Sequence, residues 1–233
     1  MREILVSTMA PILLFFTVAD AFSICKLMRI YKKNGNVISL LTAILCAGLF
    51  YDSLILSLGA VLPYGAVLKA TSQLRYVLHA SLIPLILPIC AIAMDCKKST
   101  IRVSYILMAV ISLLGLVSGF SVVTAPVTVG AIRRYAQSDL TPAFADSLTQ
   151  LLNVVPVFLM MGVGIYLWIK KKNRNLFLSG FFMFLFTMLG IFLGKDPGGD
   201  PTQSLMFYIS MYGESLMVFF LFMLINTDVN REQ

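Results

Sequence analysis

Five ionisable side chains lie inside stretches of sequence that are otherwise apolar: Asp20, Asp52, Arg75, His79 and Glu214. Such groups are costly in the hydrocarbon of a membrane, so they usually face the interior of a helix bundle and mark ion or ligand sites. At about 1.5 Å of rise per helical residue, four of the five fall at one depth and Asp20 lies deeper. A cation and two carboxylates at one depth predict that Arg75 pairs with Asp52, Glu214 or both.

This intramembrane set has two interpretations. In the functional one it is a proton relay, an ion site or a polar ligand pocket. In the structural one it is a buried network that fixes helix packing, with the arginine neutralised by a carboxylate. The candidate ligand or proton site comprises the four ionisable residues at one depth and polar side chains near them: Asp52, Arg75, His79, Glu214, Tyr76, Tyr208, Tyr212 and Asn153.

His79 shares a helical face with Arg75, because the two are four residues apart. Pro84 has no N–H, so it leaves the carbonyl of Ala80 without its helical partner, and a neutral imidazole could bond that carbonyl. An imidazole also titrates near physiological pH, so His79 could instead carry a proton or contact a ligand. We expect the first role.

Several chemistries need residues that this chain lacks. It has one histidine, whereas membrane-embedded zinc hydrolases hold their metal with several, so no metal site is predicted. A Gly-x-Ser-x-Gly motif, typical of one class of serine hydrolases, is missing from the sequence. The four cysteines form no Cys-x-x-Cys pair and are expected to be small packing residues rather than disulfides.

The elements that must position these residues are helices that span a membrane. Charged residues make up only 12% of the 233 residues, against about a quarter in soluble domains. A stretch of about 20 apolar residues crosses the hydrocarbon core as a helix. Seven stretches meet this requirement: 4–27, 37–62, 66–94, 103–123, 147–169, 176–194 and 203–226. The predicted fold is an all-α, polytopic bundle of seven transmembrane helices that forms one domain over residues 1–233.

Basic residues set the predicted orientation, because cytoplasmic loops carry the excess of lysine and arginine. The connections after the first, third and fifth spans, together with the C-terminal tail, hold twelve of these residues, and the opposite side holds five. The chain is therefore predicted to place its N-terminus outside and its C-terminus in the cytoplasm, as a multi-pass protein of the inner or plasma membrane. The net charge of +7 then reflects a cytoplasmic face beside anionic lipids, and no nucleic-acid partner is expected.

The longest connection covers residues 124–146, between the fourth and fifth spans. A loop of this length is either ordered cover for one end of the bundle or a functional loop. Within the spans, Pro11, Pro84, Pro88 and Pro156 are expected to kink their helices, which membrane helices tolerate when neighbours satisfy the freed carbonyls.

The third span contains an Arg75-Tyr76 pair followed eight residues later by Pro84. This pattern resembles the third helix of microbial rhodopsins, and the length, seven spans and predicted orientation are similar as well. The resemblance implies a rhodopsin-like arrangement of helices. In it, Arg75 would be the family's outer-half arginine, Pro84 its mid-helix proline, and His79 would stand at its retinal-packing tryptophan.

The chain departs from the rhodopsin pattern where retinal is concerned. The family's counterion carboxylate, three residues after the arginine, is Leu78 here. The last span has no lysine, and Glu214 or Tyr212 stands near the position of the family's retinal-binding lysine. We therefore expect no retinal Schiff base, no light-driven pump and no other cofactor.

Three functions from different classes follow from these residues. The first is a transporter of a small solute, coupled to protons or not, or a sensor, with a polar site inside the membrane. The second is a membrane-embedded enzyme that acts on lipid with Asp52 and Glu214 as acid and base. The third is a structural or partner-binding subunit without chemistry. Membrane lipids and a small-molecule ligand are the expected partners, and no particular oligomeric state is predicted.

Overall fold

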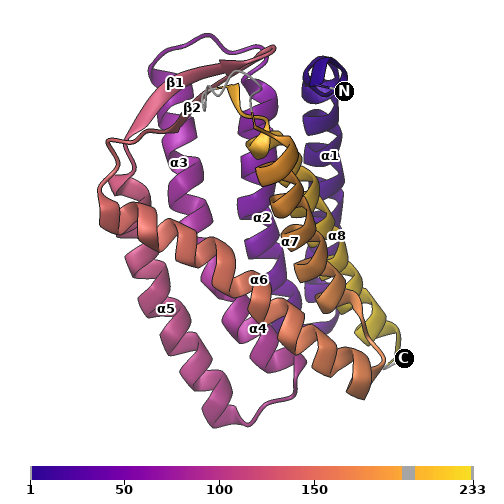
Figure 1. The fold of residues 1–233 in the computed structure, drawn as a ribbon. Helices are drawn as coiled ribbons and strands as arrows, with labels where there is room; N and C mark the ends of the chain where they lie inside the picture. The colour runs from indigo at the N-terminus through magenta and orange to yellow at the C-terminus, as the bar shows by residue number, and fades with distance from the viewer. Residues whose placement is uncertain (1, 196–202, 232–233) are drawn as a thin grey trace.

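A computed structural model describes residues 2–195 and 203–231, and seven helices within them are long and apolar enough to cross a membrane (Figure 1). This confirms the all-α bundle predicted from the sequence. The third span is divided into three short elements, and the other six are single helices. The helical elements are α1 (Arg2–Asn34), α2 (Val37–Leu58), α3 (Ala66–Leu82), η1 (Ile83–Leu85), α4 (Ile86–Ala93), α5 (Lys98–Ser121), α6 (Ala143–Lys171), α7 (Asn175–Leu193) and α8 (Met206–Arg231).

The third span breaks at Pro84, which lies in the single 3₁₀ turn between α3 and α4. Proline cannot donate the helical bond to the carbonyl four residues earlier. That carbonyl, on Ala80, lies against Gly115 of α5, where a Cβ atom would collide with it. The kink expected at Pro84 is thus a break in the helix, whereas α1 and α6 continue through Pro11 and Pro156.

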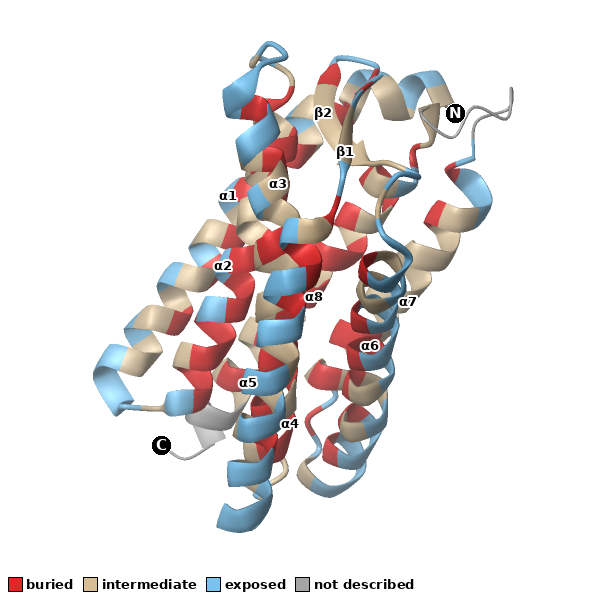
Figure 2. Cartoon of the chain, turned by 90° about the vertical axis from the view of Figure 1, so that its left-hand side faces the viewer, coloured by how far each residue is buried: buried red, intermediate tan, exposed pale blue. Residues whose placement is uncertain are grey.

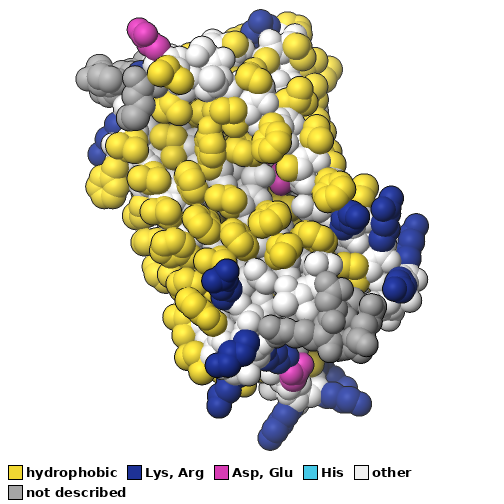
Figure 3. Space-filling view, turned by 90° about the vertical axis from the view of Figure 1, so that its right-hand side faces the viewer, with side chains coloured by type: hydrophobic (Ala, Val, Ile, Leu, Met, Phe, Trp, Pro, Cys, Tyr) yellow, Lys and Arg dark blue, Asp and Glu magenta, His cyan; other side chains and the backbone are white. Residues whose placement is uncertain are grey.

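The central helices of the bundle are α2, the α3–α4 span and α8. More than half of the most apolar window of each is buried, against a third or less for α1, α5, α6 and α7 (Figure 2). The helix α8 packs against α7, α1 and α2, while α3 packs mainly against α5 and α2. The outer helices present a broad apolar surface, and lysine and arginine side chains gather at the opposite end from the N-terminus (Figure 3).

The connection between α5 and α6 folds into an antiparallel hairpin of β1 (Thr124–Val129) and β2 (Ile132–Gln137). Gly130 opens its two-residue turn with φ +58°, a conformation that glycine adopts without strain. Val129 and Ile132 are buried against the end of the bundle, and the N–H of Arg133 donates to the carbonyl of Gly59 at 2.9 Å. Of the two alternatives expected for this segment, the structure has ordered cover. We call the covered end of the bundle the hairpin end.

Candidate functional site

An ion pair joins α2 to α3 inside the bundle. Arg75 Nε donates to Asp52 Oδ1, and the side chains are only 10% and 9% exposed. The predicted pairing of Arg75 with a carboxylate is therefore present, and Asp52 is the partner. The second oxygen of the same carboxylate, Oδ2, lies 3.7 Å from His79 Nδ1. One aspartate thus faces both Arg75 and His79 of α3.

His79 does not bond the carbonyl of Ala80, so the hydrogen-bond partner expected for it from the sequence is wrong, whereas its structural role stays a prediction. Its Nε2 lies 3.1 Å from Oδ1 of Asn153 on α6. An amide oxygen can only accept, so this contact places a hydrogen on Nε2, and in the neutral imidazole Nδ1 is then an acceptor. The Ala80 carbonyl faces α5, where it lies against Gly115.

Glu214 lies on α8 and is 8% exposed. Within the part of the chain that the structure describes, its Oε2 is buried and has no hydrogen-bond partner. The same holds for His79 Nδ1 and Arg75 Nη1. Buried polar atoms are nearly always paired with protein or water, so three orphans around one point require an explanation.

These atoms face a partly enclosed cavity of about 230 Å³ between α3, α6, α7 and α8. Its polar lining includes Thr149, Thr187 and Ser210 in addition to the residues above, and its apolar lining includes Met183 and Met206. Along α8 the lining runs from Met206 to Glu214, which is about 12 Å of helix. Met206 is exposed at the start of α8, so the cavity extends inward from the hairpin end.

The cavity narrows beyond Glu214. A small hollow of about 20 Å³ continues past His79 and Glu214 to Pro156, Met160 and Met217. Met160 and Met217 belong to the hydrophobic core that fills the other half of the bundle. The cavity is therefore closed toward the end that carries the C-terminus, while the exposed Asn153 and Val154 of α6 lie at its open side.

Not every predicted site residue lies at this cavity. Asp52, Arg75, Tyr76, His79, Asn153 and Glu214 line it. Tyr208 and Tyr212 do share a helical face, and their hydroxyls are 2.9 Å apart, but Tyr208 is fully buried in the core under the hairpin. Asp20 does not line it either. Asp20 accepts a bond from Ser215 at 2.9 Å and another from Ser53 at 3.5 Å, so it lies at the level of Asp52 and Glu214, and the deeper position predicted for it is wrong. Only the packing of α8 decided which of its polar faces turned toward the cavity.

Sequence reasoning missed Thr149 and Thr187, which line the cavity, because a threonine inside a span carries no signal of function. It also gave Arg134 no role. This β2 residue stacks its guanidinium 3.7 Å above the ring of Phe207, and burial lowers its pKa to about 10. Arg134 thus places a second cation near the ion pair of α2 and α3, at the hairpin end.

Three side chains, one from each of α2, α3 and α8, could together bind a metal ion. Asp52, His79 and Glu214 each offer one ligand atom, and these atoms lie within 4.8 Å of one another. A single histidine excludes zinc sites built mostly from imidazoles, but the fold brings two carboxylates beside His79, so the sequence-based expectation of no metal site did not cover this arrangement.

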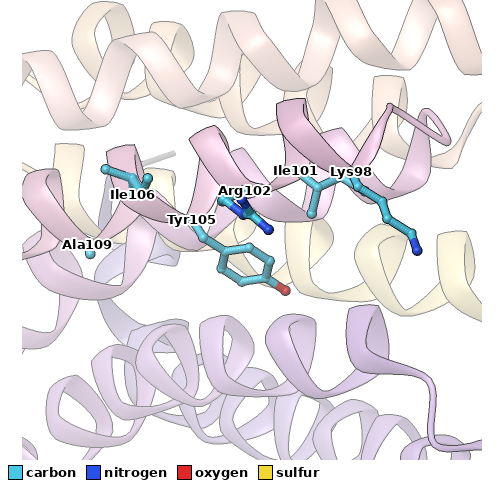
Figure 4. A pocket seen from close by; sticks show the side chains of 6 residues that line it. All are labelled: Lys98, Ile101, Arg102, Tyr105, Ile106 and Ala109. Carbon is cyan, nitrogen blue, oxygen red and sulfur yellow. The ribbon is translucent and has the colours of Figure 1, made fainter.

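A second hollow, of about 480 Å³, lies on the surface of α5 far from this site (Figure 4). It is lined by Lys98, Arg102 and Tyr105 and by apolar residues of the same helix. A shallow hollow with cations at the end of a span and apolar side chains beyond them has the composition of a lipid-facing surface.

Comparison of the chain with models of known protein families finds no match, and comparison with curated proteins finds none either. The site must therefore be interpreted from its own geometry.

Proposed function

We propose that this integral membrane protein binds a small cationic solute in the cavity at the hairpin end, as a transporter or a sensor. The observation that carries the proposal is the carboxylate of Glu214, which is buried, lacks a hydrogen-bond partner among the described residues, and faces the cavity. A buried charge without compensation is expensive. A cation or a proton bound to the Glu214 carboxylate would offset the free-energy cost of burying its charge.

The other two classes are less well supported. A purely structural network should be closed and fully paired, but three polar atoms here lack partners within the described chain. A lipid-acting enzyme would need one carboxylate as an acid and the other as a base, and Asp52 is instead held by Arg75.

The rhodopsin-like arrangement of the spans remains part of this proposal. The seven apolar helices and the position of Arg75 in the third span support it. The helix α8 contains no lysine, so we expect this protein to bind its ligand without a retinal Schiff base. Function would then come from the cavity rather than from the arrangement of helices.

The same proposal places the protein in the inner or plasma membrane, surrounded by lipid. The exposed apolar side chains of α1, α5 and α6 would contact acyl chains. Lys98 and Arg102, beside the hollow on α5, would lie near anionic headgroups.

Thermal unfolding of the protein in lipid nanodiscs, with a metal chelator present, tests the proposal. The probes are methylamine, ethanolamine and choline, with glucose and acetate as uncharged and anionic counterparts. Binding at 100 times Kd stabilises a protein by about 2.7 kcal/mol, which is about 5–10 °C in Tm for a chain of this size. We expect at least one amine to raise the Tm, and the anion to have no effect.

The variant Glu214→Gln should abolish the amine effect, and Thr187→Phe should reduce it by filling the cavity. The matched control is Asp20→Asn, which changes a buried carboxyl outside the cavity that is already bonded to Ser215 and should keep the effect. If no amine stabilises the wild type, or if stabilisation persists in Glu214→Gln, the proposal is wrong.

A further inference from the structure

Three hydrogen-bond acceptors meet at the inner end of the cavity without a donor between them. They are Asp52 Oδ2, a carboxylate oxygen of Glu214, and Nδ1 of His79. Nδ1 is an acceptor because Nε2 points its hydrogen at Asn153. Acceptors packed this closely repel one another unless a proton or a metal ion lies between them.

We propose that Asp52, His79 and Glu214 bind a divalent transition-metal ion, which makes that ion the solute or an accessory ion of the cavity. This inference rests on the proposed function, because it names the class of cation that the cavity takes. One imidazole nitrogen and two carboxylate oxygens suit zinc, iron, cobalt or manganese. A hard ion such as magnesium prefers oxygen ligands and several waters.

The geometry allows the site to close on a metal. Ligand bonds of about 2.1 Å at tetrahedral angles place ligand atoms about 3.4 Å apart, and these atoms now lie within 4.8 Å of one another. Each ligand therefore needs to move inward by roughly 1 Å. His79 Nδ1 and Glu214 Oε2 have no competing bond within residues 2–195 and 203–231, so both are free to move.

Other side chains around the ligands take supporting roles. Asn153 is a positioning residue, since it fixes the tautomer and orientation of His79 as outer partners of metal-bound histidines commonly do. Arg75 balances one of the two carboxylate charges. Three protein ligands leave further coordination positions directed at the cavity, where water or a second ligand can bind.

The single histidine makes a direct test possible. Protein purified without a histidine tag and labelled with ¹⁵N-histidine gives one imidazole, whose two nitrogen resonances are followed by NMR during titration with Zn²⁺. We expect the Nδ1 resonance to shift at one equivalent of Zn²⁺ and Co²⁺ to give d–d absorbance bands. Calorimetry should show affinity falling about 100-fold in Glu214→Gln and about 10–100-fold in Asn153→Ala.

Asp20→Asn is again the control, and it should bind Zn²⁺ as the wild type does. The inference is overturned if saturating Zn²⁺ leaves the His79 resonances unchanged. This measurement uses only the wild-type protein, so it does not depend on whether a variant folds. It is also overturned if Glu214→Gln and Asp20→Asn bind Zn²⁺ equally well. Amine binding that depends on Glu214 would then still uphold the proposed function, whereas its loss as well would refute both.

Discussion

The ion pair between Asp52 and Arg75 determines which polar atoms of the site are left for other interactions. The pair takes up one carboxylate oxygen and one guanidinium nitrogen, and it leaves Asp52 Oδ2 turned toward His79 and Arg75 Nη1 without a partner among the described residues. Because Arg75 neutralises the charge of Asp52, the free-energy cost of burying the cluster inside the membrane is lower. The remaining unpaired atoms are those available to a ligand.

Breaking this pair from one side should cost more than removing it entirely. Arg75→Leu strands the Asp52 charge, and we expect it to lower the free energy of unfolding by about 3–5 kcal/mol, as for buried pairs in soluble proteins. The double variant Arg75→Leu/Asp52→Leu should recover part of that loss. Unfolding in detergent measures both, with Lys69→Leu, an exposed site on α3, as the control. Equal stability of Arg75→Leu and wild type would show that the pair contributes little.

At the scale of elements, α3 is positioned by its close contact with α5. A Cβ on Gly119 would lie 2.6 Å from Val77 Cα and 2.9 Å from Val77 N, so only glycine lets these helices approach so closely. The side chain of Gln73 also donates to the carbonyl of Gly119 at 2.6 Å. This contact fixes the rotation of the helix that carries Arg75 and His79.

Gly119→Ala should therefore push α3 away from α5 and destabilise the protein by about 1–3 kcal/mol, as overpacking does in cores. Gly162→Ala on α6 is the matched control, because nothing lies within 4 Å of a Cβ there. It should be neutral, or stabilising by up to about 1 kcal/mol through helix propensity. Thermal unfolding compares the two, and an equal effect of both substitutions would contradict the close-contact argument.

At the scale of the molecule, the cavity and the hairpin lie at one end, and most of the basic connections lie at the other. The distribution of lysine and arginine predicts that the hairpin end faces outside. If so, the hydrophobic core beyond Glu214 closes the cavity toward the cytoplasm.

Reporter fusions test this orientation. Fusions at Lys98 and Lys172 should give a cytoplasmic signal, and a fusion at Arg134 should give an external one, because basic loops stay in the cytoplasm. A cytoplasmic signal from the Arg134 fusion would reverse the orientation and place the cavity on the inner side.

The sequence by itself determined the seven spans and the common depth of Asp52, Arg75, His79 and Glu214. Both depend on local properties: the length of an apolar stretch sets whether it spans, and the rise per residue sets depth. It also predicted that Arg75 would be paired, because an unpaired charge is costly there. Val127, Val129 and Ile132 around Gly130 carried a signal for the hairpin, but it was short and was interpreted as part of a loop.

Tertiary structure alone decided which residues form the site. Glu214 and Tyr208 lie on the same helix, yet one lines the cavity and the other is buried under the hairpin. That difference depends on how α8 is rotated against α1, α2 and α7, which is set by packing between residues far apart in the sequence. The cavity is likewise the space that α3, α6, α7 and α8 leave between them, and no single stretch of sequence encodes such a space.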